Sequence, residues 1–262
     1  NRYYAKLSLA PMLEPSTPHE AKEMTVRAYD LSEEHEMPFI LRTTTRVSHT
    51  RGIVELGEVR DRPRVGEYRK DWRRYVLIPA NARVRRKILI EKEEELREDA
   101  EKSEFNVVED GEGDVGVITS GVSYCYVKEA ARELGVNPPV LKLGFTSPAP
   151  RSLIESFSRG LKAVLVVEEL EPVLEAEVRC TLQGSKLQVE VYGKQTGHIP
   201  RAYELNTSIV GTALAELLGL KWATGEVQEA PIKAPPRPPV LCPGCPHRGT
   251  AYILKQVIGD KA

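Results

Sequence analysis

The sequence lacks the marks of a membrane or secreted protein. No apolar run approaches the roughly 20 residues that a membrane-spanning helix requires. The chain does not open with a signal peptide, so we expect a cytoplasmic protein with no membrane partner. Cysteine is scarce, with four residues, and its spacing is unlike the disulfide framework of a small secreted domain. Cys125 and Cys180 fall in predicted helices, where we expect free, buried thiols.

Net charge is also nearly absent. The chain has 37 Lys and Arg against 38 Asp and Glu, which gives a net charge of −1. This balance predicts no overall electrostatic attraction to nucleic acid or to a membrane surface. Hydrophobic residues make up 41% and charged residues 29% of the 262 positions. Such a composition is typical of a soluble globular protein with a substantial core in one or two domains.

The sequence does contain a regular alternation of short apolar runs and amphipathic segments over residues 114–170. The runs 115–119, 140–145 and 163–167 are rich in β-branched residues and too short for helices. The segments between them carry apolar residues at helical spacing and end on glycine: Val127, Ala130, Ala131 and Leu134 before Gly135, and Leu153, Ile154 and Phe157 before Gly160. This order predicts an α/β fold in which right-handed crossovers join the strands of a parallel sheet.

Segments on either side extend this unit. Residues 1–58 predict a helix from Pro18 to about Met37 and a strand over 39–44, which cannot form a core by themselves. After the third central strand, the pattern predicts a helix over 172–182, a half-exposed edge strand over 187–191 and a last helix over 207–220. The central unit at 111–225 is therefore expected to hold about four strands.

The first central strand is not followed by a nucleotide-binding fingerprint. The loop reads Thr-Ser-Gly-Val-Ser over 119–123, whereas a dinucleotide site requires GxGxxG at this point. The sequence therefore predicts a sheet that serves packing or contact with a partner.

Side chains suited to anions follow the strand at 39–44. Arg42, Thr44 and Arg46 lie in a run that also holds Ser48 and His49. At the carboxyl end of a parallel strand such residues are well placed for a ligand. A cluster of hydrogen bonds between domains is the alternative interpretation.

The connector over 59–110 carries almost no strand signal. It begins with a basic run in which Tyr68, Trp72 and Tyr75 are interleaved, and it continues as a charged helix from Pro79 to about Glu104. Arginines on phosphates and rings as stacking platforms would suit a nucleic acid over 60–74. Because the second half of the segment is strongly acidic, we interpret it as a solvated helical connector packed across two domains.

A proline-rich stretch over 226–241 predicts a stiff, extended linker. It leads to Cys242-Pro-Gly-Cys245-Pro-His247-Arg248, and a helix follows over 250–258. A CxxC before a helix is compatible with a redox dithiol, half of a zinc knuckle or half of an iron–sulfur site. Two unligated thiols in a turn are a fourth possibility, and the spacing alone does not choose among them.

Taken together, several runs resemble one enzyme family. CPGCPHRGT after a proline-rich linker resembles the opening of the thiamin-diphosphate-binding domain of 2-oxoacid:ferredoxin oxidoreductases. LEPSTPHEAKEM and PFILRTTTRVSH resemble the end of the pyrimidine-binding domain in the arylpyruvate branch, the alpha subunit of indolepyruvate:ferredoxin oxidoreductase. TSGVSYCYVKEA, LGFTSPAP and KAVLVVEEL resemble its transketolase C-terminal-like domain. The runs follow the family order along the whole chain.

The resemblance implies a division of the chain into five parts. These are the end of the pyrimidine-binding domain at 1–58, the helical connector at 59–110, the transketolase C-terminal-like domain at 111–225, the linker at 226–241 and the start of the diphosphate-binding domain at 242–262. We therefore expect an internal fragment that is inactive alone. The carboxylate that activates the aminopyrimidine is expected before Asn1. The GDG-type motif and a cysteine-rich tail are expected after Ala262.

The resemblance also implies the reaction. An arylpyruvate, with indolepyruvate as the first choice, loses CO2 on thiamin diphosphate, which Mg²⁺ helps to hold. Electrons pass through 4Fe-4S clusters to ferredoxin, and coenzyme A accepts the acyl group. The implied partners are a beta subunit and ferredoxin.

Three groups of residues receive roles from this resemblance. Cys242 and Cys245 are the candidate metal ligands, and His247 and Arg248 are the candidates to face the diphosphate. Arg42, Thr44 and Arg46 are expected to face substrate or an adjoining domain. The alternative function is a non-catalytic α/β scaffold or assembly module with a terminal CxxC zinc or redox knuckle.

Overall fold

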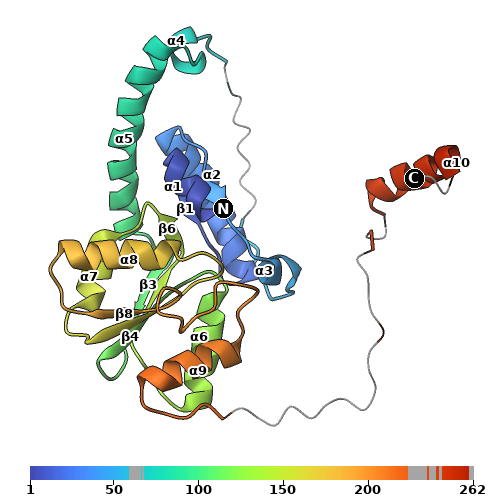
Figure 1. Cartoon of the computed structure of the whole chain (residues 1–262). Helices are drawn as coiled ribbons and strands as arrows, with labels where there is room; N and C mark the ends of the chain where they lie inside the picture. Colours follow the sequence, from blue (N-terminus) through green and yellow to red (C-terminus); the bar gives the residue numbers. More distant parts are fainter. Residues whose placement is uncertain (59–65, 67, 224–234, 236–239, 242–243, 260–262) are drawn as a thin grey trace. The chain divides into compact units, whose positions relative to one another are not determined.

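The computed structural model describes residues 1–58, 66, 68–223, 235, 240–241 and 244–259. The chain divides into two compact units, Asn1–Ala223 and Thr224–Ala262. The first unit holds two sheets and the helices that cover them (Figure 1). In the second, the described residues form one helix, α10 (Pro246–Ile258), in which no residue is buried.

The larger sheet of the first unit has five strands in the order β3-β5-β4-β7-β8. The strands are β3 (Asn106–Glu109), β4 (Val115–Ser120), β5 (Val140–Leu143), β7 (Ala163–Val167) and β8 (Glu190–Tyr192). β5, β4, β7 and β8 pair in parallel, and β3 pairs antiparallel with β5 at one edge. The predicted parallel sheet is confirmed, and the strand expected near 187–191 lies at the other edge.

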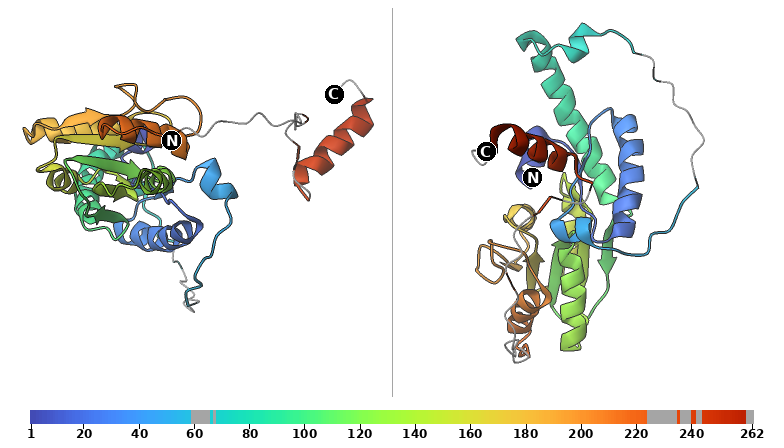
Figure 2. Two further views of the ribbon diagram at one scale, coloured as in Figure 1. Left: turned by 90° about the horizontal axis from the view of Figure 1, so that it is seen from below. Right: turned by 90° about the vertical axis from the view of Figure 1, so that its right-hand side faces the viewer.

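Helices cover both faces of this sheet (Figure 2). On one face, Val117 and Leu165 pack against α6 (Ser123–Leu134) and α9 (Thr207–Leu217). On the other face, Ile118 and Val166 pack against α7 (Arg151–Ser158) and α8 (Val173–Gly184). Successive residues of one strand thus enter opposite cores, which is why β4 and β7 read as continuous apolar runs.

Residues 1–58 form a small sheet with a strand from the central unit. They contribute α1 (Arg2–Ser8), β1 (Met12–Leu13), α2 (Pro18–His35), β2 (Ile40–Leu41) and α3 (Thr45–His49). β1 pairs in parallel with β2 and antiparallel with β6 (Phe145–Ser147), which follows β5 in the chain. The Thr17 hydroxyl accepts a hydrogen bond from Glu20 N and so begins α2, and Pro18 occupies the first turn.

The connector between these parts contains α4 (Trp72–Tyr75) and α5 (Pro79–Glu101). Leu96 and Ala100 of α5 are fully buried in a core shared with Met24 and Phe145. α4 and the first turns of α5 stand away from the rest of the unit as an arm (Figure 1).

Three sequence expectations need correction. The run 140–145 forms two strands, because Gly144 separates them; a Cβ there would lie 2.6 Å from Met24 Cε and 2.7 Å from the Phe105 carbonyl oxygen. The strand expected over 39–44 is limited to β2. The connector does contain a strand, β3, which adds a fifth strand to the four that residues 111–225 contribute to the larger sheet, in agreement with the number expected for that range. Val107 and Val108 of β3 are both partly exposed, and this strand therefore lacks the alternation that marks a half-buried one.

Candidate functional site

The order of the parallel strands creates one crevice where a ligand would be expected. The chain runs from β4 outward to β5, and then returns to the other side of β4 to form β7. In open α/β sheets ligands bind outside the carboxyl ends of strands at such a switch point. Here it lies where β4 ends at Ser120 and β7 ends at Val167.

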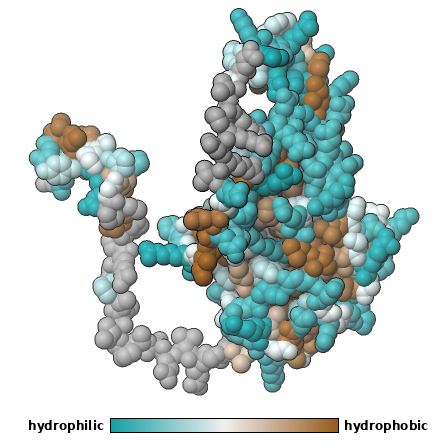
Figure 3. Space-filling model, turned by 180° about the vertical axis from the view of Figure 1, so that it is seen from behind, coloured by the Kyte–Doolittle hydropathy of each residue, from teal (hydrophilic) through white to brown (hydrophobic). Residues whose placement is uncertain are grey.

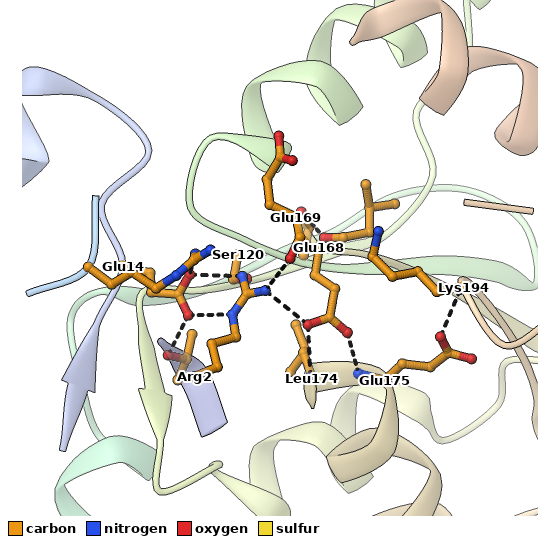
Figure 4. Close-up of polar contacts among 12 residues, drawn as sticks. Arg2, Glu14, Ser120, Glu168, Glu169, Leu174, Glu175 and Lys194 are labelled. Carbon is orange, nitrogen blue, oxygen red and sulfur yellow. Dashed lines mark hydrogen bonds and ion pairs between the residues drawn. The ribbon is translucent and has the colours of Figure 1, made fainter. Parts of the chain in front are cut away.

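This crevice is filled by an arginine of the same chain. Arg2, from α1, points its guanidinium between the ends of β4 and β7 (Figure 4). Its Nη2 donates to Ser120 Oγ at 3.0 Å, and its Nη1 donates to the Glu169 carbonyl oxygen at 2.7 Å and to Glu168 Oε2 at 3.1 Å. Only 7% of Arg2 is exposed. A protein cation therefore occupies the position where a ligand would otherwise be expected.

Glu14, just after β1, is the main counter-charge. It accepts two hydrogen bonds from Arg2, at 2.7 Å from Nε and 2.8 Å from Nη2. It also accepts one from Arg42 Nη1 at 2.6 Å and one from Thr146 Oγ1 at 3.0 Å. Burial alone would raise the pKa of Glu14, but the two arginines and the threonine hydroxyl bring it below its ordinary value. Glu14 is therefore ionised, and four donor contacts saturate it.

Glu168 is the second carboxylate beside Arg2. It follows β7, is fully buried, and accepts hydrogen bonds from Leu174 N at 2.9 Å and Glu175 N at 2.8 Å. It thus caps the first turn of α8, where the helix dipole favours an anion. Burial raises the pKa of Glu168, and Arg2 with these two amide groups offsets part of the rise.

A second buried set of charges surrounds the end of β8. Glu175 of α8 accepts from the backbone nitrogens of Lys194 at 2.7 Å and Gln195 at 3.1 Å. Lys194 Nζ donates to the Pro200 carbonyl oxygen at 2.6 Å, and burial lowers the pKa of this amine. Burial also raises the pKa of Glu169, whose carboxylate accepts the long bonds that Leu205 N donates, at 3.3 and 3.4 Å. Burial therefore disfavours the charged forms of both Glu169 and Lys194.

The three predicted anion-binding residues do not share one site. Arg42 is buried and bound to Glu14, and the Thr44 hydroxyl begins α3 by accepting from Val47 N at 3.5 Å. Arg46 is exposed and forms an ion pair with Glu204, at 2.9 Å from Nη2 to Oε2. The Arg46–Glu204 pair joins residues 1–58 to the central unit, whereas Arg42 and Glu14 both lie within residues 1–58.

The CxxC segment lies in the second unit. Cys242 is outside the described residues. Cys245 Sγ lies 3.3 Å from His247 Nδ1 in the first turn of α10, and His247 and Arg248 are both exposed. Among the described residues, no group of three His, Cys, Asp or Glu side chains is placed to hold a metal ion.

Comparison with known proteins identifies the family. The family model described as the indolepyruvate oxidoreductase domain matches residues 106–234. The indolepyruvate oxidoreductase subunit IorA of Methanothermobacter marburgensis is 47% identical over 262 residues, which cover 99% of this chain. The IorA subunit of Archaeoglobus fulgidus is 43% identical over 270 residues, again across 99% of the chain. The chain belongs to the indolepyruvate oxidoreductase family.

This member of the family spans only 42% of the length of either IorA relative. A solved structure, the 2-oxoglutarate:ferredoxin oxidoreductase of Magnetococcus marinus, aligns with 79% of the chain and 42% of its own chain. The TM-score is 0.53 at 17% sequence identity, a likeness that concerns the fold alone. The predicted α/β class with a parallel sheet is confirmed.

The buried residues of the crevice were not singled out from the sequence of this family member. Glu168 and Glu169 carried a usable signal, because two acids directly after a buried strand must find partners. Arg2 and Glu14 carried none, since the contacts of Arg2 with β7 join residues about 166 positions apart. Cys125 and Cys180 are both free thiols, and Cys125 is half-buried. Cys180 is exposed, so its predicted burial was wrong.

The aromatic residues of the basic run lie against their own neighbours. The Arg73 guanidinium lies 5.5 Å from the centre of the Trp72 ring, and that of Arg74 lies 5.3 Å from the centre of the Tyr75 ring. Arg74 also forms an ion pair with Glu36 at 3.0 Å. The rings of Trp72 and Tyr75 remain 53% and 57% exposed. None of the helices in the described part of the chain is long and apolar enough to cross a membrane.

Proposed function

We propose that this chain is part of an enzyme that oxidatively decarboxylates indolepyruvate to an aryl-acyl-CoA with ferredoxin as electron acceptor. The observation that carries the proposal is the 47% identity, over 99% of the chain, with a subunit named indolepyruvate oxidoreductase IorA. The implied partners are a second subunit, the beta subunit, and ferredoxin. Coenzyme A and the 2-oxoacid are the small-molecule substrates.

The residues present fit part of the cofactor set. Thiamin diphosphate, when bound with Mg²⁺, supplies the carbanion chemistry that releases CO2. His247 and Arg248 lie exposed in the first turn of α10, where cations and free backbone N–H groups favour a diphosphate. Cys242 and Cys245 supply at most two of the four thiolates that a 4Fe-4S cluster takes. The remaining ligands would have to come from elsewhere in the enzyme.

The first unit has a supporting part in this proposal. Arg2, Glu14 and Arg42 form a buried bridge that fixes residues 1–58 on the carboxyl edge of the sheet. Because the bridge ends at Arg42, it also fixes the start of the segment that holds Thr44 and Arg46. The chain's own residues thus position this segment and exclude water from the crevice, while the chemistry depends on groups bound elsewhere.

The test is an activity and metal measurement on the complete enzyme that contains this chain. We expect reduction of ferredoxin that requires indolepyruvate, coenzyme A and thiamin diphosphate together, with iron and acid-labile sulfide in the protein. Cys245→Ser should lower the iron content, whereas the exposed Cys180→Ser serves as a matched control and should not. Stoichiometric zinc in place of iron, with no turnover of any 2-oxoacid, would favour the scaffold with a zinc knuckle.

A further inference from the structure

Four helices of the first unit line a cavity of about 210 Å³. α1 and the first turns of α7 and α8 contribute to it, together with the segment 146–149 in and after β6. α5 adds Glu93 and Arg97, and hydrophilic side chains cover most of the arm that this helix forms with α4 (Figure 3). An engineered cavity of about 150 Å³ in another protein binds benzene. The cavity here is therefore large enough for one or two fused rings.

One part of the lining is apolar and buried. Ala5 of α1 and Met12 of β1 are fully buried, and Ala149 and Leu174 are 4% and 3% exposed. A flat ring that covers these side chains loses contact with water, which favours its binding. The thioether of Met12 is polarisable and suits an aromatic ring in particular. This part of the cavity therefore selects an apolar group.

The rest of the lining carries an excess of positive charge. Its charged residues are four cations and two anions: Arg2, Lys6, Arg97, Arg151, Glu93 and Glu177. Three of the four cations already have an acidic partner on the protein: Glu14 for Arg2 at 2.7 Å, Glu177 for Lys6 at 2.5 Å and Glu93 for Arg97 at 3.3 Å. The fourth cation, Arg151, is left over.

Arg151 forms no ion pair within the described part of the chain. It is the first residue of α7 and is exposed. The backbone nitrogens of the next two residues, Ser152 and Leu153, both donate to the carboxylate of Glu101 at 2.8 Å. Because that carboxylate already satisfies the start of the helix, an anion in the cavity would have the Arg151 guanidinium as its partner.

We propose that this cavity binds a small monocarboxylic acid whose apolar part is one or two rings. The rings lie on Met12, Ala149 and Leu174, and the carboxylate pairs with the Arg151 guanidinium through a charge-assisted hydrogen bond. The two glutamates of the lining would repel a ligand with several negative charges, such as a nucleotide. A neutral ring would leave Arg151 without a partner.

The site is independent of the reaction proposed above. All of its lining residues belong to the first unit, so it needs neither the CxxC segment nor the helix of the second unit. A ligand in the cavity contacts α1 and α8 at once. It should therefore hold residues 1–58 more firmly on the sheet and stabilise the folded unit by mass action.

Isothermal titration calorimetry on the full chain tests the proposal with 2-naphthoate, which has two fused rings and one carboxylate. We expect one site per chain and a Kd of about 0.1–1 mM, as befits a ligand with so few atoms. The amide 2-naphthamide has the same shape without the charge, and it should bind at least about tenfold more weakly. Saturating 2-naphthoate should also raise the Tm of the first unit.

Two substitutions separate the carboxylate contact from the ring contact. Arg151→Gln removes the cation and should weaken the binding of 2-naphthoate about tenfold without affecting 2-naphthamide. Val173→Phe places a ring in the cavity from the first residue of α8 and should abolish the binding of both compounds. Arg159→Gln makes the same charge change at the exposed far end of α7 and should alter neither affinity.

Arg151 is exposed and Val173 is half-buried, so both variants should fold, which circular dichroism checks. Should Val173→Phe fail to fold, Arg151→Gln still decides the matter. The proposal is overturned if 2-naphthoate shows no saturable binding in the millimolar range, or if it binds Arg151→Gln as tightly as the wild type. Undiminished binding to a folded Val173→Phe would place the ligand elsewhere and would overturn it as well.

Discussion

The segments that precede and follow the central unit in the sequence differ in how far their side chains are buried. Residues 1–58 bury three charged side chains, Arg2, Glu14 and Arg42, and add two strands to a sheet. Residues 244–259 bury none of their side chains, and Tyr252 and Val257 are 68% and 77% exposed. The first segment therefore owes its position to contacts within this chain. The helix of the second, at 13 residues, has the length at which an isolated helix is marginal in water.

The largest loss of stability is expected from a substitution that removes the central cation of the first segment. Arg2→Met removes the cation between Glu14 and Glu168 and leaves both carboxylates buried, and this should lower the free energy of unfolding by about 3–5 kcal/mol. Chemical denaturation of the first unit, followed by tryptophan fluorescence or circular dichroism, measures the change. A loss below about 1 kcal/mol would contradict the role assigned to Arg2.

Removing the carboxylate has a smaller effect with a distinct pH dependence. Glu14→Gln should cost about 2–4 kcal/mol at neutral pH, because it leaves Arg2 and Arg42 short of a counter-charge. The folded pKa of Glu14 lies below its ordinary value of 4.5. Its contribution is therefore present above that value and is lost as the pH falls through the folded pKa. The difference between Glu14→Gln and wild type should shrink in acid; a constant difference would contradict the ionised state.

A second tie between residues 1–58 and the sheet is expected to be weaker. Lys142 of β5 is buried, pairs with Glu20 of α2, and lies 4.8 Å from the Tyr124 ring centre. Lys142→Met keeps much of the apolar contact and leaves Glu20 partly solvated, with 23% of its side chain exposed. We expect a loss of about 1–2 kcal/mol in the free energy of unfolding. A loss as large as that of Arg2→Met would mean that the two ties are equivalent.

Glu169 should respond in the opposite direction. Its pKa is raised by burial, so its ionised form opposes folding at neutral pH. This cost falls as the pH drops from the folded pKa towards the ordinary value of 4.5, and it is absent below that value. Glu169→Gln keeps an acceptor for Leu205 N and should raise the free energy of unfolding at pH 7 by less than about 1 kcal/mol. In acid the variant and the wild type should be equally stable. Destabilisation at pH 7 would show that the charge is needed.

The smallest effect is expected in the second unit. Arg248→Met removes an exposed arginine with no buried contact, and should change the stability of the first unit by less than about 0.5 kcal/mol. The same substitution, arginine to methionine, is therefore expected to have the largest effect on stability at Arg2 and the smallest at Arg248. A loss above about 1 kcal/mol at Arg248 would show that α10 contributes to the fold of the first unit.

The local hydrophobic pattern of the sequence was sufficient to predict the central strands of the sheet. It was insufficient to predict the buried polar contacts in the crevice. β4 and β7 have both faces buried, so their sequences are continuous apolar runs, and α6 shows its packed face at helical spacing. β3 was not predicted because Val107 and Val108 are both partly exposed, so its sequence lacks the alternation of a half-buried strand. Arg42 was singled out from the sequence because its neighbours are also side chains suited to anions. Its partner Glu14 was not, since nothing local distinguishes a carboxylate that will be buried from one that will be solvated.

The position of Arg2 in the chain determines how late in synthesis its buried contacts can form. Its partner Glu168 comes 166 positions later in the chain, which a ribosome working at about 5–20 residues per second reaches roughly ten to thirty seconds afterwards. During that interval α1 has been made but the end of β7 has not, and β4 is complete only once Ser120 has been added. The nascent segment must keep this arginine in water, or in a provisional contact, until the second half of the sheet emerges.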